Sequence, residues 1–435
     1  MPFSNIVPIS PVVNVGTYDG WKGIQADPAG EWDDSANCVA YGNGLWLVGG
    51  LGINSLMYSI TGRDNWTPIA EVYNQDMLNG IVSIAYGNNH WVITQPLTKI
   101  GYSSSGRSNW TFVDLSGIVL TISRVYYGQD LFGNDKWFVS GSYYNEYMAL
   151  VSKLIYSPTG TTDWTEVLEV NGLFNIDPII SHGYDVDGND LWLVGGSSDT
   201  DYTVYYSTTG LDNFMPVLGS KELMSRVQYV YYANGIWMLS GWSPDTNLFY
   251  SFTGVDGWTP VVGMKTILPL ITAISYFNGL WVAVGNGNDN SIAYSTSGID
   301  NWIGVPRAYN EITQDNAYGV AHNDSSLWVV CGSAGANNVK ITSALTPTVI
   351  SSSSLGTTKV VLLPDTTTVP GSSYLIRDSG GFCSFATQIH ISTTTVNDTI
   401  DLYSNHLYLS TPHESVKVIS NGNGIWSILQ NYKQG

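Results

Sequence analysis

The chain has 435 residues, and 43% of them are hydrophobic, which is enough for more than one compact domain. Sixteen basic residues against 35 acidic ones give a net charge of −19, and a field of that sign repels phosphate backbones and anionic lipid. Nucleic-acid binding and membrane-surface binding are therefore not expected. No window approaches the roughly 18 consecutive apolar residues of a membrane span. The three cysteines, Cys38, Cys331 and Cys383, lack metal-ligand spacing and are interpreted as buried thiols.

Seven times along the chain, a tryptophan opens an apolar run just after a tight-turn signal. These residues are Trp46, Trp91, Trp137, Trp192, Trp237, Trp281 and Trp328. A repeat of roughly 45 residues that is rich in strand formers is typical of a β-propeller, because one four-stranded sheet buries both its faces only when neighbouring copies stack on it. No stretch of comparable length shows helical periodicity, so we predict an all-β chain.

Residues 37–70 show how one unit is built. NCVAY alternates as a half-buried strand does, Asn43-Gly44 supplies the two positive-φ positions of a type I′ hairpin, and LWLVGG is the return strand. A second turn leads to SLMYSI, and TGRDN turns the chain into WTPIA, so we predict four strands with three short connections. The first turn recurs in other units, and we expect the same chemistry at Asn234-Gly235, Asn278-Gly279, Asn88-Asn89, Asn134-Asp135 and Asn189-Asp190.

The seventh unit is incomplete, because the glycine and tryptophan of the third turn do not follow Trp328. Ahead of the first full unit, residues 18–21 (YDGW) match residues 255–258 (VDGW), which lead into a fourth strand. We therefore expect the strand at residues 21–24 to complete the blade of Trp328, since a ring closed in this way has no free sheet edge. The prediction is a seven-bladed propeller over residues 1–349, closed by the N-terminal strand.

Composition changes sharply after the ring, near Thr346 to Leu355. Fifteen of the sixteen tryptophans precede residue 329, and residues 349–399 are crowded with Ser and Thr. Beyond this point, segments such as KVVLLP, SYLIRD and SVKVIS are typical of short strands with polar turns. We predict a small β domain over residues 350–435. A domain with so little core of its own often completes its burial in an oligomer.

One mouth of the central channel is the best candidate for a binding site. Counting back 11 to 13 residues from a repeat tryptophan reaches the start of an innermost strand. The chain has only six arginines, and two occupy this place on blades three and five, where paired guanidinium groups could hold a carboxylate. The alternative is that these residues are solvated and form ion pairs at the rim. The candidate residues are Asp33, Asp34, Arg124, Arg226 and Asp315. Arg307 lies too far ahead of its blade to complete a triad.

Motifs for catalysis, metal binding or cofactor binding are not found. The chain has no HExxH, no GxSxG and no phosphate-cradling glycine loop, and its six histidines are scattered. We therefore predict no catalytic residue, metal site or cofactor. DVDGND at residues 185–190 resembles a calcium loop in composition, but its glycine is misplaced for an EF-hand and position twelve is Gly196. We interpret it as an enlarged first hairpin, as in GQDLFGNDKW.

The third turns, for example YSITGRDNW and YSTSGIDNW, resemble the Asp-box (BNR) turns of sialidase-type propellers. The stretch from Gly279 to Trp302 resembles repeats in propeller proteins of bacteriophages and large DNA viruses, and the resemblance covers roughly residues 17–346. In this chain the glycine comes one residue early and Ser or Thr replaces the aspartate. The family's turns are structural, so the resemblance implies the fold and not hydrolysis. Sialidase-type enzymes gather arginines at the channel mouth to hold a carboxylate.

The strand order of the last 80 or so residues resembles the C-terminal domains of viral fibre and tail proteins, which commonly trimerise. The two resemblances imply a non-enzymatic protein of the virion surface whose propeller attaches to a host glycan or protein. The C-terminal domain would form a homotrimer or bind other capsid or fibre proteins. The first ten residues lack the features of a signal peptide, which fits synthesis in the host cytoplasm. The alternative is a sialidase-like, glycan-cleaving hydrolase acting at the channel mouth.

Overall fold

The computed structural model describes residues 35–333, apart from residues 53, 64, 74–79, 176–177, 288, 307–315 and 325–326, and eight strands between residues 348 and 432. Residues 22–276 and 281–343 belong to one compact unit, and residues 344–435 belong to another. The expected closing strand at residues 21–24, like Cys383, lies outside the described residues.

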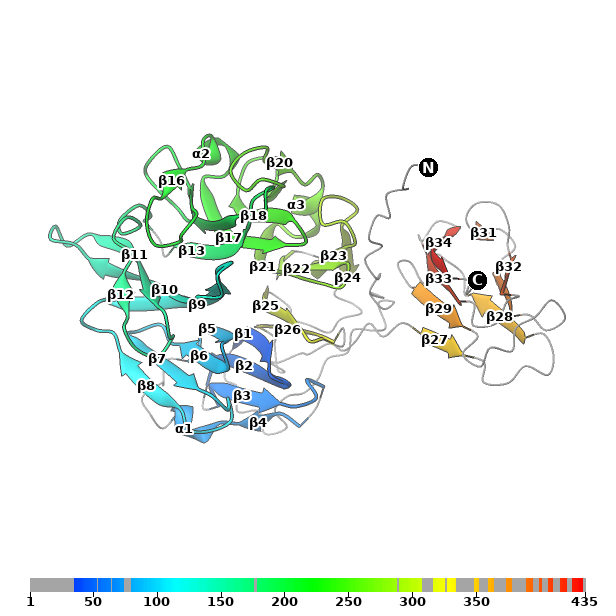
Figure 1. The fold of residues 1–435 in the computed structure, drawn as a ribbon, viewed down its shortest axis with the longest axis horizontal. Coiled ribbons are helices and arrows are strands. Elements are labelled where there is room, and N and C mark those ends of the chain that lie inside the picture. The colour runs from blue at the N-terminus through cyan, green and yellow to red at the C-terminus, as the bar shows by residue number, and fades with distance from the viewer. Residues whose placement is uncertain are drawn as a thin grey trace. The chain divides into compact units, whose positions relative to one another are not determined.

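The first unit is an all-β propeller, as predicted, and its described residues form six sheets around a common centre (Figure 1). Five sheets have four antiparallel strands each. Their strands are β5 (Ser83–Gly87), β6 (His90–Thr94), β7 (Lys99–Ser103) and β8 (Thr111–Asp114); β9 (Thr121–Gln129), β10 (Asp135–Tyr144), β11 (Leu150–Ser157) and β12 (Thr165–Glu166); β13 (Ile179–Tyr184), β14 (Asp190–Gly195), β15 (Val204–Ser207) and β16 (Met215–Pro216); β17 (Arg226–Ala233), β18 (Ile236–Trp242), β19 (Leu248–Ser251) and β20 (Thr259–Pro260); and β21 (Leu270–Phe277), β22 (Leu280–Asn286), β23 (Asn290–Ser295) and β24 (Ile303–Pro306).

The sixth sheet has six strands, because two antiparallel groups share it. One group is a four-stranded blade and the other is a hairpin, and a single residue pair, Ser35 with Ser333, joins them. The strands are β1 (Ser35–Gly42), β2 (Leu45–Leu51), β3 (Leu56–Ser59), β4 (Thr67–Pro68), β25 (Asn316–His322) and β26 (Trp328–Ser333). The seven predicted repeat units therefore appear as six sheets, in which the last unit is a two-stranded hairpin.

Three one-turn helices follow outer strands, and the sequence did not predict them. They are α1 (Ala70–Tyr73), α2 (Ser220–Leu223) and α3 (Met264–Ile267). No helix in the described ranges is long and apolar enough to cross a membrane.

The seven repeat tryptophans all lie near the start of the second strand of their unit and are at most 1% exposed. In the blade of β13–β16, the ring of Trp192 packs against the third turn. Gly210 has a φ of 73°, and a Cβ at this glycine would lie 2.7 Å from Trp192 Cδ2. Ser207 holds the turn, because its Oγ accepts hydrogen bonds from the Thr209 and Gly210 N–H groups and donates one to the Asp212 carbonyl. The repeat tryptophan and the third-turn glycine, the two strongest repeat signals of the sequence, thus contact each other.

The first turns follow the prediction in four units and differ from it in two. Asn43 and Gly44 have φ values of 47° and 73°, as a type I′ turn requires, and both Asn88 and Asn89 also have positive φ. The expectation was wrong for Asn134-Asp135 and Asn189-Asp190, where the positive φ belongs to the preceding glycine. The cause is a side chain, because the Asp130 and Asp185 carboxylates each accept two backbone N–H groups and an asparagine Nδ2 in their own loop.

The second unit contains two sheets. Their strand orders are β27-β29-β33-β34-β31 and β28-β30-β32, and three pairings are parallel: β27 with β29, β28 with β30, and β31 with β34. Its buried side chains include Ile391, Val416, Val418 and Trp426, each 0% exposed. The strands are β27 (Thr348–Ser351), β28 (Lys359–Leu363), β29 (Ser373–Arg377), β30 (Ile389–Thr393), β31 (Thr399–Ile400), β32 (His406–Leu409), β33 (Ser415–Ser420) and β34 (Ile425–Tyr432).

Candidate functional site at the channel mouth

The innermost strands surround a cavity of about 660 Å³ along the centre of the propeller. The first strand of each predicted repeat unit contributes to its lining: β1, β5, β9, β13, β17, β21 and β25, which Figure 1 places around the centre. The hairpin of β25 and β26 therefore takes part in the channel as the complete blades do.

Side chains connect neighbouring inner strands. The Tyr126 hydroxyl on β9 accepts a hydrogen bond from the His182 N–H on β13 at 2.8 Å. The Tyr231 hydroxyl on β17 accepts one from the Tyr276 N–H on β21 at 3.0 Å. Thr272 Oγ1 on β21 donates to the Ala317 carbonyl on β25 at 2.6 Å. Because these bonds join strands of different sheets, they fix the positions of the side chains that line the channel.

A second cavity of about 220 Å³ adjoins the channel and contains both predicted arginines. Arg226 is the first residue of β17, and Arg124 is the fourth residue of β9. The two cavities share Ser123, Arg124, Ile179 and Thr272, so the arginine pocket is continuous with the channel lining. The polar lining of this pocket consists of Ser123, Arg124, Ser197, Arg226, Gln228 and Thr272.

Arg124 stacks on a tyrosine of the channel. Its Cζ lies 5.7 Å from the ring centroid of Tyr229, which in turn stacks on Tyr231 with centroids 6.3 Å apart. Burial raises the pKa of Tyr229 to about 12; the hydroxyl of Tyr231 adds to this effect, and Arg124 opposes it. The Tyr229 hydroxyl is therefore neutral at physiological pH and can donate a hydrogen bond.

Within the described residues, neither cavity lining includes an Asp or Glu. The Arg226 guanidinium makes no hydrogen bond or ion pair with another described residue. The other predicted site residues, Asp33, Asp34 and Asp315, lie outside the described residues, as does Arg307. The structure thus brings together the two predicted arginines.

Sequence inspection missed Gln228 and Trp242. Gln228 Oε1 is buried and has no hydrogen-bond partner among the described residues. Trp242 ends β18, is 58% exposed and pairs directly with Arg226 across the sheet. A tryptophan outside the repeat positions was the available signal for Trp242, whereas nothing in the sequence singles out Gln228.

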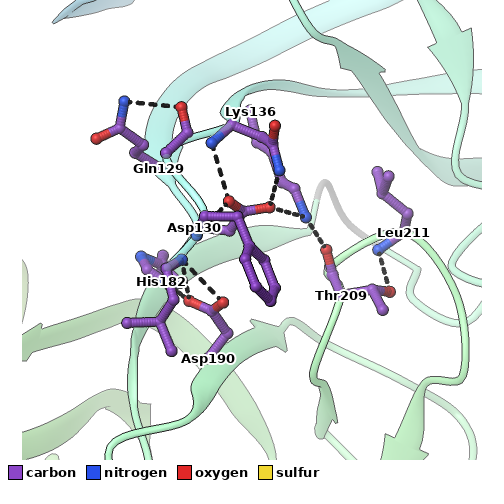
Figure 2. Close-up of polar contacts among 12 residues, drawn as sticks. Gln129, Asp130, Lys136, His182, Asp190, Thr209 and Leu211 are labelled. Atoms are coloured by element: carbon purple, nitrogen blue, oxygen red, sulfur yellow. Dashed lines mark hydrogen bonds and ion pairs between the residues drawn. The ribbon is translucent and has the colours of Figure 1, made fainter.

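A separate polar cluster joins the blade of β9–β12 to the blade of β13–β16 (Figure 2). Lys136 Nζ lies 3.5 Å from Asp130 Oδ2 and donates to the Thr209 carbonyl at 2.6 Å. His182 Nε2 lies 2.8 Å from Asp190 Oδ1, and the Asp190 carboxylate also accepts the Leu131 N–H. Because Asp130 and Asp190 are committed to these contacts, the cluster is an inter-blade connection.

The loop at residues 185–190 fits the hairpin interpretation. The two Asp185 oxygens accept hydrogen bonds from the Asp187 and Asn189 N–H groups and from Asn189 Nδ2 at 2.9 Å each. These bonds lower the pKa of the Asp185 carboxyl, although partial burial opposes them. No group of three or more metal-ligating side chains occurs among the residues that the structure describes.

Comparisons with known proteins identify the fold. No family model and no curated protein matches the chain. The structure of YCF48 bound to D1 peptide is similar, with 11% identity, a TM-score of 0.52, and coverage of 76% of this chain and 97% of that one. YCF48 from Cyanidioschyzon merolae has 12% identity, a TM-score of 0.49 and coverage of 74% and 98%. The GH74 xyloglucanase from Xanthomonas campestris has 13% identity, a TM-score of 0.49 and coverage of 72% and 52%. At these identities the likeness shows a β-propeller fold alone.

Proposed function

We propose that this chain is a non-enzymatic attachment protein of a virion surface, whose channel mouth binds a carboxylate of a host glycan. The observation that carries the binding site is the arginine pocket. Arg124 and Arg226 line it and no described Asp or Glu does, although acidic residues outnumber basic ones by 35 to 16 in the chain. Guanidinium groups favour an anionic ligand, and carboxylates match their planar donor geometry.

Binding is favoured over cleavage by the chemistry of the described lining. Most glycoside hydrolases use a pair of carboxyl groups that flank the scissile bond, and the described part of either cavity contributes none. Tyr229, with its pKa near 12, is a poor nucleophile at neutral pH. The sialidase-like alternative therefore depends on Asp33, Asp34 or Asp315.

The rest of the proposed architecture follows from the repeats. We infer a ring of seven blades, in which β25 and β26 belong to the seventh and residues 21–24 supply its outer strand. The participation of β25 in the channel and the hydrogen bond from Thr272 to Ala317 support this count. Residues 350–435 would trimerise or bind other capsid or fibre proteins, consistent with their resemblance to fibre domains.

A glycan array probed with the full-length chain tests the proposed site. We expect carboxylated glycans to be retained. Arg226→Ala should weaken their binding by about 1.5–3 kcal/mol, the contribution of a hydrogen bond to a charged group. Arg63→Ala, at an exposed arginine of a third turn, is the matched control and should change nothing. Binding of neutral glycans only, or full binding by Arg226→Ala, would contradict the site, and turnover of the glycans would favour the hydrolase.

A further inference from the structure

Trp242 differs from the seven tryptophans of the repeat. They are at most 1% exposed and belong to the core between blades, whereas Trp242 is 58% exposed at the end of β18. No described aromatic ring stacks on it. A large aromatic surface is therefore left in water without a core function.

The register of the sheet places Trp242 beside the arginine pocket. Arg226 on β17 pairs directly with Trp242 on β18, and the Ser225 N–H and Oγ both donate to the Trp242 carbonyl, at 2.9 and 3.1 Å. Directly opposed residues of an antiparallel pair project from the same face, with Cβ atoms about 4.5–5.5 Å apart. The indole and the guanidinium are therefore neighbours on one face of the blade.

That face is turned toward β21 of the next blade. Ser240, two residues before Trp242 on the same strand, donates from its Oγ to the Ile271 carbonyl of β21. Ile271 lines the pocket with Arg226. Because residues two apart on a strand share a face, Trp242 lies on the side of its blade that faces β21.

The groups gathered here match one class of ligand. The Arg226 guanidinium has no partner among the described residues and favours an anion, Gln228 Oε1 lacks a donor among them, and an exposed indole offers an apolar face. An acidic pyranoside presents a carboxylate, hydroxyl donors and an apolar C–H face on a single ring. A simple carboxylate can bind the arginines but offers nothing to Trp242 or Gln228. A neutral sugar can stack on Trp242 and donate to Gln228 but carries no charge for the arginines.

We propose that Trp242 is a stacking platform that makes the channel mouth specific for acidic pyranosides. The inference rests on the proposed function, since it requires an anion at Arg226. In the bound state the carboxylate lies at the arginines, a hydroxyl donates to Gln228 and the C–H face of the ring covers the indole. The arginines bind any carboxylate, and stacking on the indole makes the site prefer those that are attached to a pyranose ring.

The test compares three probes on the full-length chain by ligand-observed NMR titration: sodium D-glucuronate, sodium acetate and methyl β-D-glucopyranoside. In the wild type, glucuronate should bind about tenfold more tightly than acetate, and its ring protons should shift upfield as they cover the indole. Trp242→Ala should abolish the shift and lower glucuronate affinity to that of acetate, while Trp242→Phe retains part of both effects. Val262→Ala removes another exposed apolar residue, 90% exposed, and should change nothing.

The outcomes separate the two proposals. Equal binding of glucuronate and acetate by the wild type, or an unchanged preference in Trp242→Ala, would overturn the platform and leave the anion site standing. Loss of acetate and glucuronate binding together in Arg226→Ala supports the anion site. If neither anion binds the wild type, both proposals fail. Melting curves of each variant confirm that the fold is intact.

Discussion

At the scale of single residues, the polar contacts inside the propeller join consecutive repeats. Asp190 receives the Leu131 N–H from the preceding blade, and Lys136 donates to Thr209 of the following one. Buried polar groups are costly unless they are paired, so these contacts favour one arrangement of neighbouring blades. The His182 ring within this cluster lies 4.3 Å from the ring of Trp192, centroid to centroid.

The stability of the folded chain should fall as the pH drops below about 6.5, the unperturbed pKa of histidine. Burial lowers the pKa of His182, with Asp190 and Asp130 opposing the shift and Lys136 adding to it, and burial likewise lowers the pKa of His322. The unfolded chain then binds more protons than the folded chain, and each histidine contributes a slope of at most about 1.4 kcal/mol per pH unit. Urea unfolding at pH 7.5 and 5.0 measures the loss.

His182→Asn should reduce the difference in stability between the two pH values, because it removes one of the two described histidines whose pKa is lowered by burial. A wild-type stability that rises from pH 7.5 to 5.0 would contradict the assigned direction.

The residues of the candidate site were predictable only in part. The count from repeat tryptophans reached Arg124 and Arg226, because the repeat fixes where each inner strand begins. It could not reach Trp242, whose position opposite Arg226 depends on the bulge between Val227 and Tyr229. A bulge shifts the register by one residue, and the repeat spacing contains no sign of it.

At the scale of elements, the third turn and the repeat tryptophan form one structural unit. The prediction is that Gly210→Ala destabilises the propeller by about 2–4 kcal/mol: a left-handed φ costs a residue with a Cβ about 1–2 kcal/mol, and the clash with Trp192 adds an overpacking cost. Chemical unfolding followed by tryptophan fluorescence measures this change, since fifteen of the sixteen tryptophans precede residue 329.

Gly188→Ala is the matched control for that measurement. Gly188 has a φ of 81°, but a Cβ there would have no atom within 4 Å. Gly188→Ala should therefore lower the free energy of unfolding only by the left-handed strain, about 1–2 kcal/mol. Equal losses at the two glycines would show that the tryptophan contact contributes nothing.

The strand order within each blade was predictable, because every repeat unit shows the same succession of apolar runs separated by turn residues. The two misassigned first turns show where this approach fails. Asn134 and Asn189 have the residue type of a type I′ turn, but Asp130 and Asp185 bond to the loop backbone and move the positive φ to the glycine. An aspartate that accepts backbone N–H groups elsewhere in the loop can thus change the turn conformation, even though the Asn-Asp dipeptide itself is typical of a type I′ turn.

At the scale of the whole molecule, the described ring closes where β25 and β26 pack against β1 of the first blade. A single residue pair, Ser35 with Ser333, joins β1 to β26, whereas the strands within the other blades pair along their length. The repeat predicted seven units, and the described residues give six sheets because this contact merges the last hairpin with the first blade. The proposed outer strand at residues 21–24 would complete that hairpin.

Deletion of residues 1–30 should therefore lower the melting temperature sharply, because it would leave the last blade without its outer strand and open the ring. Differential scanning calorimetry of the truncated and intact chains measures the effect. Deletion of residues 350–435 is the comparison, since it removes mass without opening the ring. Identical propeller transitions before and after removal of residues 1–30 would refute closure by the N-terminal strand.

The final prediction concerns assembly. We expect the full chain to be a trimer and residues 1–346 to be a monomer. The C-terminal unit buries Trp426, Val416 and Val418 within one copy, so each copy has a small core, but about 80 residues rarely supply more than a few kcal/mol. Wrapping identical copies around one axis adds buried surface, and folding of this unit should then depend on concentration. Light scattering at micromolar concentration measures both masses, and a monomeric full-length chain would refute the trimer.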